Sequence, residues 1–236
     1  MESFGKRAPL YHRYSLIQNW AREGLSRWVR GRVLDLGAGP AGLCGVPGVQ
    51  FYLGVDSSPE MAQLNRCPVV VANFDQFPIL EVVERYQITQ IVSFSALQWS
   101  KDLEGLLQKI GKSGRRYLLL LFTGESFQQL HRRLGITSPL PREREILEWA
   151  HRHLPNLHSA PLSYTLHFPS PRELFRYLRG SGVSGGVRVP VPKLWALRKN
   201  PPLLLESRLL LLSSEPEPVE WFRQFAPGIE SYWEER

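Results

Sequence analysis

The order of apolar and polar positions along the chain predicts short strands that alternate with helices. Apolar residues recur at helical spacing between positions 11 and 30, which predicts an amphipathic first helix. Short apolar runs at 32–36, 50–55, 69–74, 88–94 and 116–122 predict strands, and the segments 59–65, 78–86 and 102–111 predict helices between them. This alternation is typical of an α/β fold, a Rossmann-like, mostly parallel sheet with helices on both faces.

The rhythm changes after residue 122. Two polar, arginine-rich helices are predicted at 126–134 and 142–153, and we expect an inserted helical lid over about 124–160. The remaining predicted elements are a strand at 162–168, a helix at 171–179 and a strand at 203–212. One domain, 1–212, would then be followed by an acidic and aromatic tail, 213–236, in which we expect a helix packed on the domain.

Composition and apolar run length narrow the class of protein. Of the 236 residues 43% are hydrophobic and 22% are charged, as in an ordinary globular chain. The longest apolar runs are too short to span a bilayer, and residues 1–12 lack the apolar core of a secretion signal. Two cysteines, Cys44 and Cys67, cannot form a disulfide framework or a four-ligand zinc site by themselves. We therefore expect a cytoplasmic monomer without a metal.

Charge is distributed unevenly. Residues 115–199 hold 14 Lys and Arg against five Glu, whereas 206–236 hold seven Glu against three Arg. A basic middle segment indicates either a polyanionic partner (nucleic acid, an acidic protein or an anionic cofactor) or simply a solvated arginine-rich surface.

The stretch Val-Leu-Asp-Leu-Gly-Ala-Gly at 33–39 carries the most chemical information. A hydrophobic strand ends in Asp35, and Gly37 and Gly39 follow in a turn where a ligand can approach the backbone. Dinucleotide-binding folds share such glycines, and they share the acid that ends the next strand, here Asp56 before Ser57. Asp35, two residues before the first glycine, favours a methyltransferase. The stretch thus predicts a site for S-adenosylmethionine (SAM), with Asp56 accepting the ribose hydroxyls.

Three further residues follow predicted strands and complete the expected cofactor site. Asn73 can hydrogen-bond the adenine amino group, Phe74 can cover the adenine ring, and Ser93 ends the fourth strand, where the methyl donor should lie. The carboxyl ends of parallel strands are the usual ligand crevice in such sheets.

Over roughly residues 4–212 the sequence resembles the BioC-type malonyl-[acyl-carrier protein] O-methyltransferases of biotin synthesis. The likeness includes Phe4-Gly5, the glycine turn, Phe94 to Trp99 with Asp102-Leu103, and Leu140-Pro141. The chain departs from the family in several places: the segment after Gly39 has no room for a long first helix, Thr89 and Asn73 each stand in place of an acid, and Thr137-Ser138-Pro139 replaces an Asn-Arg-Phe element.

The resemblance implies methyl transfer from SAM to the free carboxylate of a malonyl thioester on an acidic acyl-carrier protein. Tyr11, Gln18 and Trp99 would line the acceptor side, and an arginine, Arg142 or else Arg133, would neutralise the carboxylate. Two alternatives stay open: a methyltransferase for a small-molecule acid, phenol or amine, and a non-catalytic binding subunit of the same fold.

Overall fold

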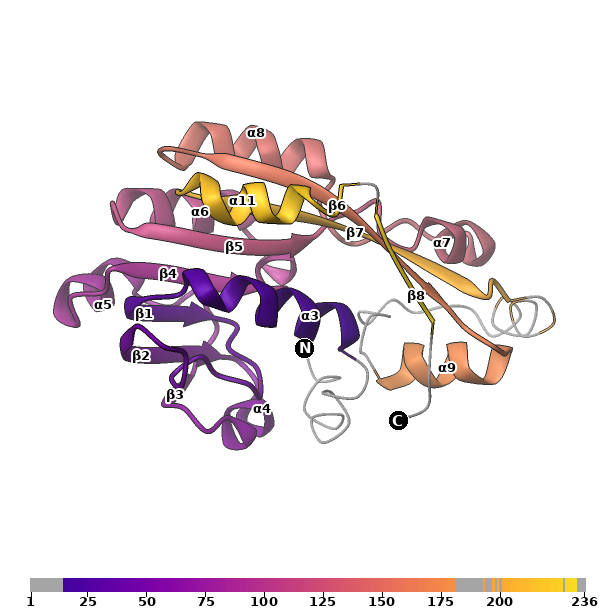
Figure 1. Ribbon diagram of the computed structural model, residues 1–236, viewed down its shortest axis with the longest axis horizontal. Helices are drawn as coiled ribbons and strands as arrows, with labels where there is room; N and C mark the ends of the chain where they lie inside the picture. Colours follow the sequence, from indigo (N-terminus) through magenta and orange to yellow (C-terminus); the bar gives the residue numbers. More distant parts are fainter. Residues whose placement is uncertain are drawn as a thin grey trace.

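The computed structural model describes residues 15–180, 193, 197, 199, 201–226 and 228–232. They form one eight-stranded sheet with the order β3-β2-β1-β4-β5-β7-β6-β8 (Figure 1). The first five strands in sequence pair in parallel, and β7 runs antiparallel to both β5 and β6. The predicted α/β, Rossmann-like sheet is therefore confirmed.

The elements keep the predicted order with shifted ends. The strands are β1 (Gly31–Leu36), β2 (Val49–Asp56), β3 (Val69–Val71), β4 (Gln90–Phe94), β5 (Arg116–Phe122), β6 (His158–His167), β7 (Leu204–Ser213) and β8 (Ile229–Tyr232). The α-helices are α3 (Leu16–Leu25), α4 (Pro59–Leu64), α5 (Ile79–Arg85), α6 (Leu103–Lys112), α7 (Gln128–Leu134), α8 (Glu143–His153), α9 (Pro171–Gly180) and α11 (Pro216–Arg223). Short 3-10 helices occupy Ser26–Trp28 and Leu97–Trp99. Among the described helices, none is long and apolar enough to cross a membrane.

Strand β5 shows how the sheet is covered on both faces. Its side chains alternate between two separate apolar clusters, with Leu118 and Leu120 in one and Leu119 and Leu121 in the other. All four are buried, as expected for a central strand whose side chains point to opposite faces. The first cluster also takes apolar residues from α3, α7, α9 and α11, and the second takes them from α5, α6 and α8.

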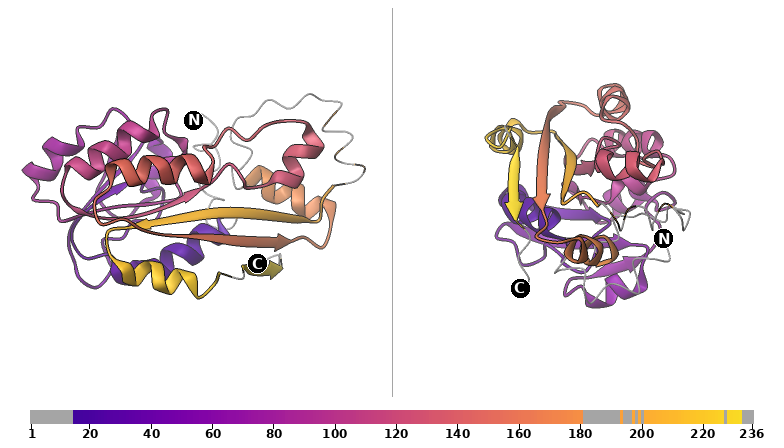
Figure 2. Two further views of the ribbon diagram at one scale, coloured as in Figure 1. Left: turned by 90° about the horizontal axis from the view of Figure 1, so that it is seen from above. Right: turned by 90° about the vertical axis from the view of Figure 1, so that its right-hand side faces the viewer.

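The two helices of the expected lid belong to different layers. Helix α8, which was expected in the lid, places Ile146 and Ala150 in the same cluster as α6 and so covers one face of the sheet. The pairing of β7 with β5 begins at Leu209, so the first half of β7 extends past the carboxyl end of β5 together with β6. Figures 1 and 2 show α7 and α9 beside this extension. Of the two helices expected in the lid, α7 and not α8 therefore lies past the carboxyl end of β5, together with α9.

The C-terminal segment packs on the N-terminal helix. Trp221 of α11 stacks on Trp20 of α3 with ring centroids 5.7 Å apart, and Phe225 meets Trp20 edge to face at 5.2 Å. A Cβ on Gly24 would lie 2.1 Å from the Trp221 ring, so the glycine permits this close approach. The helix expected in the tail is present, and the tail also adds an edge strand, β8, that its sequence does not announce.

Candidate functional site

Two adjoining hollows lie at the carboxyl ends of β1, β2 and β4, on either side of the glycine turn. One hollow, called here the acid hollow, is lined by Gln18, Asn19, Arg22, Asp35, Gly37, Ala38, Gly39, Pro40, Ala41 and Phe94. The other, called here the serine hollow, is lined by Gly37, Gly39, Pro40, Asp56, Ser57, Ser58, Met61, Phe74, Phe94, Ser95, Ala96 and Trp99. Because they share the turn, one elongated ligand can occupy both.

The two glycines of the turn serve different purposes. Both have positive φ, +78° at Gly37 and +58° at Gly39, where L side chains are strained. A Cβ on Gly37 would lie 2.1 Å from the Cβ of Ala96, so Gly37 is required by packing. A Cβ on Gly39 would meet nothing within 4 Å, so Gly39 opens backbone to a ligand.

Asp56 ends β2 and braces the same turn. One carboxylate oxygen accepts the Gly39 N–H at 2.8 Å and the other accepts the Ser58 N–H at 2.9 Å. Burial raises the pKa of the Asp56 carboxyl, and hydrogen bonds from the backbone of Ser58, Gly39 and Ser57 oppose the rise. A carboxylate has lone pairs for about four hydrogen bonds, so ribose hydroxyls can still be accepted here.

Asp35 is the buried acid of the acid hollow. Its carboxylate accepts the Tyr52 O–H at 2.8 Å. Burial raises the pKa of Asp35 to about 7; the hydrogen bond from Tyr52 and the positive charge of Arg22 lower it, and the charge of Asp56 raises it further. The side-chain oxygen of Gln18 is also buried, with no hydrogen-bond partner among the described residues. Two acceptors in one hollow fit an ammonium group, such as that of a methionine moiety.

The residues expected around adenine and the methyl group divide into two kinds. Phe74 lines the serine hollow, as does Ser57. Asn73 is not among the lining residues, and its side-chain oxygen accepts the Asp75 N–H at 3.0 Å. Ser93 is fully buried and donates its hydroxyl to the Leu36 carbonyl at 2.6 Å, which ties β4 to β1. Neither side chain reaches the hollow in this arrangement.

Ser95, which the sequence did not single out, lines the serine hollow instead. Its φ of +65° turns the chain out of β4, and its amide bonds the Leu120 carbonyl at 2.8 Å. The Ser95 hydroxyl is buried, and within the described part of the chain no group hydrogen-bonds it. A strained backbone and an unsatisfied hydroxyl beside a crevice are typical of a ligand-contacting residue.

The residues expected at the acceptor side are not all gathered here. Gln18 and Trp99 lie in the two hollows, one in each. Arg133 of α7 and Arg142 at the start of α8 are exposed and line neither hollow. Tyr11 lies outside the described residues.

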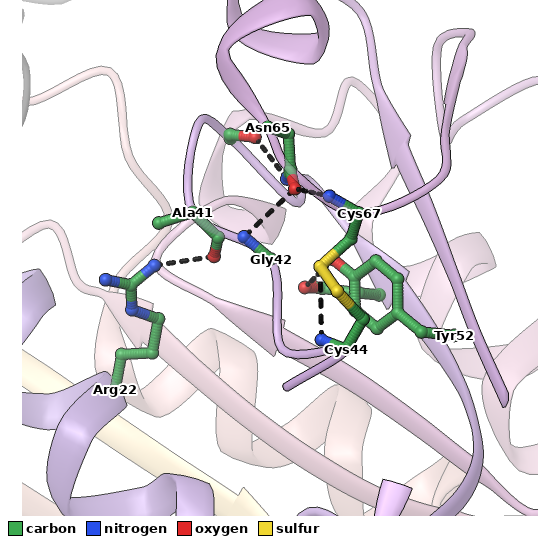
Figure 3. Close-up of a disulfide and its surroundings, with 9 residues drawn as sticks. Arg22, Ala41, Gly42, Cys44, Tyr52, Asn65 and Cys67 are labelled. Atoms are coloured by element: carbon green, nitrogen blue, oxygen red, sulfur yellow. Dashed lines mark hydrogen bonds between the residues drawn. A yellow bond between two sulfur atoms is a disulfide. The ribbon is translucent and has the colours of Figure 1, made fainter. Parts of the chain in front are cut away.

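A disulfide joins Cys44 to Cys67 beside the glycine turn (Figure 3). No pairing of these two cysteines was expected from the sequence. The bond ties the segment after Gly39, which holds no helix and runs as turns and bends up to β2, to the connection between α4 and β3. The expected absence of a long helix after Gly39 is therefore confirmed, and the disulfide lies where that helix would be.

Comparison with solved structures places this architecture among known folds. A putative methyltransferase of an antibiotic biosynthesis pathway from Anabaena variabilis matches 83% of this chain and 95% of its own length, with a TM-score of 0.57 at 15% identity. A putative methyltransferase from Haloferax volcanii, in complex with the Trm112 activator, covers 90% of this chain and 95% of its own, with a TM-score of 0.53 at 18% identity. The chain has the class I SAM-dependent methyltransferase fold. A Haemonchus contortus phosphoethanolamine N-methyltransferase, with a TM-score of 0.52 at 16% identity over 84% of this chain and 53% of its own, was solved with S-adenosylhomocysteine. SAM, the predicted cofactor, is the methyl donor of this methyltransferase fold family.

One curated relative gives a more specific likeness. The malonyl-[acyl-carrier protein] O-methyltransferase of Chlorobium luteolum is 30% identical over 179 residues. The aligned region covers 69% of this chain and 66% of the relative, just under two thirds of its length. No protein-family model matches the chain.

Proposed function

We propose that this methyltransferase-fold chain binds SAM and methylates the free carboxylate of a malonyl group carried as a thioester by an acidic acyl-carrier protein. The 30% identity to the Chlorobium malonyl-[acyl-carrier protein] O-methyltransferase is the observation that carries the proposal. The two hollows support it, because they offer acceptors for a ribose and for an ammonium group on either side of an open glycine backbone.

In this proposal the acids divide the cofactor between them. Asp56 accepts ribose hydroxyls while it holds the turn, and Phe74 and Met61 flank the adenine side of the serine hollow. Asp35 and Gln18 receive the ammonium group in the acid hollow. When bound, SAM supplies a methyl group activated by a sulfonium.

The acceptor chemistry asks little of the protein in acid–base terms. A malonyl carboxylate is already ionised near pH 7, so no side chain has to remove a proton from it. The protein's contributions are alignment of the carboxylate and exclusion of water. Trp99 and Ser95 stand at the wall of the serine hollow, where the Ser95 hydroxyl can donate to a carboxylate oxygen.

Mass spectrometry tests the proposal directly. Malonyl-carrier protein incubated with SAM and this protein should gain the mass of one CH₂ unit, and acetyl-carrier protein, which lacks the free carboxylate, should not. Methyl transfer to free small acids but not to the carrier-bound group would favour the small-molecule alternative. SAM binding without turnover on either would favour a binding subunit.

An arginine from the segment after β5 should neutralise the acceptor carboxylate, because an unpaired charge in a dry site is costly. Arg142, beside Gly124 at the start of α8, is the first candidate, and Arg133 of α7 is the second. Arg→Met at the responsible position should lower turnover about 10²-fold, or about 2.7 kcal/mol of transition-state stabilisation, and leave SAM affinity unchanged.

Steady-state kinetics of the Arg142→Met and Arg133→Met variants tests this, with Arg144→Met on the outer side of α8 as the control. Arg144 is exposed and pairs with Glu148, so its replacement should leave turnover unchanged. Turnover within about threefold of the parent in both test variants would remove the arginine from the mechanism.

A further inference from the structure

The backbone between Gly39 and Gly48 is ordered more by contacts with other elements than by hydrogen bonds within the segment. In this fold a glycine turn normally leads into a helix, whose own hydrogen bonds keep the turn in place. Here the internal backbone bonds within the segment are sparse, such as Val46 N–H to Leu43 O at 3.0 Å. Its order must therefore come from contacts with other elements.

Asn65, at the end of α4, supplies two of these contacts and a third hydrogen bond to Cys67 (Figure 3). Its side-chain oxygen accepts the Gly42 N–H at 3.2 Å and the Cys67 N–H at 2.9 Å, and its amide donates to the Gly39 carbonyl at 2.8 Å. One side chain thus joins the cofactor turn to the backbone that carries Cys67.

The disulfide closes the same junction covalently. Cys44 and Cys67 have Cα atoms 5.7 Å apart, and the Cys44 N–H also donates to the Cys67 sulfur. Gly42 lies so close that a Cβ there would sit 2.5 Å from the same sulfur. The turn, Asn65 and the disulfide therefore form one packed unit.

This unit reaches both acids of the site. Gly39, held by Asn65 through its carbonyl, donates its N–H to Asp56. Tyr52, whose hydroxyl donates to Asp35, also interacts with the backbone of Leu43, the neighbour of Cys44. Displacement of the segment would therefore move the partners of Asp35 and Asp56 together.

We propose that the Cys44–Cys67 bond is a redox-responsive brace that positions the cofactor turn, so that cofactor affinity falls when the bond is reduced. The inference rests on the proposed function only in taking the ligand to be SAM or its product. In the reduction a dithiol supplies two electrons and two protons: the sulfur–sulfur bond breaks, each cysteine becomes a thiol, and the dithiol is oxidised to its own disulfide. The freed segment must then be ordered by the ligand itself, which lowers the observed affinity.

Calorimetry with S-adenosylhomocysteine compares the two redox states. Thiol alkylation followed by mass spectrometry first establishes that the protein purified without reductant has no free cysteine and that dithiothreitol exposes two. We expect the dissociation constant to rise about 5- to 10-fold on reduction, within the usual range of coupling between two sites. The matched control is the double variant Cys44→Ser, Cys67→Ser, which should bind as weakly as the reduced protein and ignore dithiothreitol.

Linkage provides a readout that a loss of general stability does not produce. If the ligand prefers the oxidised form tenfold, the oxidised form must gain the same factor when ligand is present. For this two-electron couple the midpoint potential of the cysteine pair should then become about 30 mV more negative in saturating S-adenosylhomocysteine.

Hydrogen exchange without ligand separates this inference from the proposed function. Amides of residues 39–48 should exchange faster after reduction, while those of β4 and β5 keep their protection. A protein that binds no S-adenosylhomocysteine in either state but shows this local change would overturn the proposed ligand and retain the brace. Two free thiols in the unreduced protein, or equal exchange, affinity and potential in both states, would overturn the brace.

Discussion

Two carboxylates, Asp35 and Asp56, meet the glycine turn from different strands and hold it in different ways. Asp56 uses both of its oxygens on backbone N–H groups of Gly39 and Ser58, so it is both a brace and a ligand contact. Asp35 accepts the hydroxyl of Tyr52 and lines the acid hollow. We therefore expect Asp56 to affect cofactor binding chiefly through its charge and its hold on the turn, and Asp35 through its state of ionisation.

Replacing Asp56 by Ala should weaken SAM binding by about 1.5–3 kcal/mol, because a charged acceptor of hydroxyls and a brace of the turn are lost together. Isothermal calorimetry measures the change. Glu84→Ala is the matched control, since this carboxylate is exposed on α5 and pairs with Arg115, and neither residue lines either hollow. Equal affinity in the parent and the Asp56 variant would exclude a ribose contact.

SAM affinity should rise with pH through the titration of Asp35. The pKa of about 7 lies above the ordinary value, so the carboxyl is neutral below pH 7 and charged above it. A cationic ammonium binds the charged form more tightly, and the ionised fraction grows about fivefold between pH 6 and pH 7. Affinity should grow by the same factor. Asp35→Asn should flatten this dependence, and any titration of the ligand itself cancels in the comparison. A slope shared by parent and variant would assign the pH effect elsewhere.

The sequence predicted that the two acids and the glycines lie together at the candidate site, because these residue types occupy fixed positions in a strand–turn motif. The sequence pointed to Ser93 and not to Ser95, although Ser93 lies near the end of β4 and Ser95 directly follows that strand. Ser93 continues the strand and turns to the Leu36 carbonyl, whereas Ser95 leaves the strand with φ of +65°. Such a conformation depends on contacts made after folding, so residue type and spacing could not reveal it.

At the scale of elements, hydrophobic periodicity predicted the order of strands and helices, since the five parallel strands β1 to β5 carry short apolar runs. It did not predict β8, an edge strand whose residues alternate between partly buried and exposed positions and so carry no apolar run. The disulfide was also out of reach, because Cys44 and Cys67 are 23 positions apart and meet only through tertiary structure. Likewise, α8 and α7 look alike in sequence as arginine-rich amphipathic helices, but α8 packs with α6 on the sheet and α7 lies at its carboxyl end.

Helix α7 is the element where we expect an acidic carrier protein to dock. Arg132 is exposed on this helix, at the end of the sheet where the hollows open. Arg132→Glu should raise the KM for malonyl-carrier protein severalfold, most strongly at low ionic strength, because exposed charges are screened over about 8–10 Å in salt. Arg144→Glu, on the outward surface of α8, is the control and should change the KM little. Steady-state kinetics at two salt concentrations would contradict carrier docking at α7 if both variants behaved alike.

The whole molecule joins its first and last described helices over the sheet. Gln18, Asn19 and Arg22 line the acid hollow from α3, and α3 is held from behind by Trp221 of α11. Arg27 of the adjoining 3-10 helix lies 5.4 Å from the Trp221 ring. We therefore expect the acid hollow to depend on Trp221, which is far from it in sequence and lines neither hollow.

Trp221→Ala should lower the free energy of unfolding by about 2–3 kcal/mol, below the cost for a fully buried tryptophan because this ring is partly exposed. It should also weaken SAM binding, since α3 loses its support. Trp149→Ala, partly buried against the other cluster on α8, should cost similar stability without altering affinity. Denaturant unfolding and calorimetry on both variants test this, and an unaltered affinity in the Trp221 variant would uncouple α11 from the site.

The seat of Trp221 on Trp20 also has a consequence for how the protein is made. A ribosome synthesises α3 well before α11, and domains generally fold from the N-terminal side during synthesis. A nascent chain synthesised as far as β5 already contains both acids and the glycine turn. Helix α3, which lines the acid hollow, still lacks its contact with Trp221 of α11. We therefore expect capture of the methyl donor to strengthen only after α11 has been synthesised and has packed on α3, and a chain interrupted before α11 should bind SAM more weakly than one that contains it.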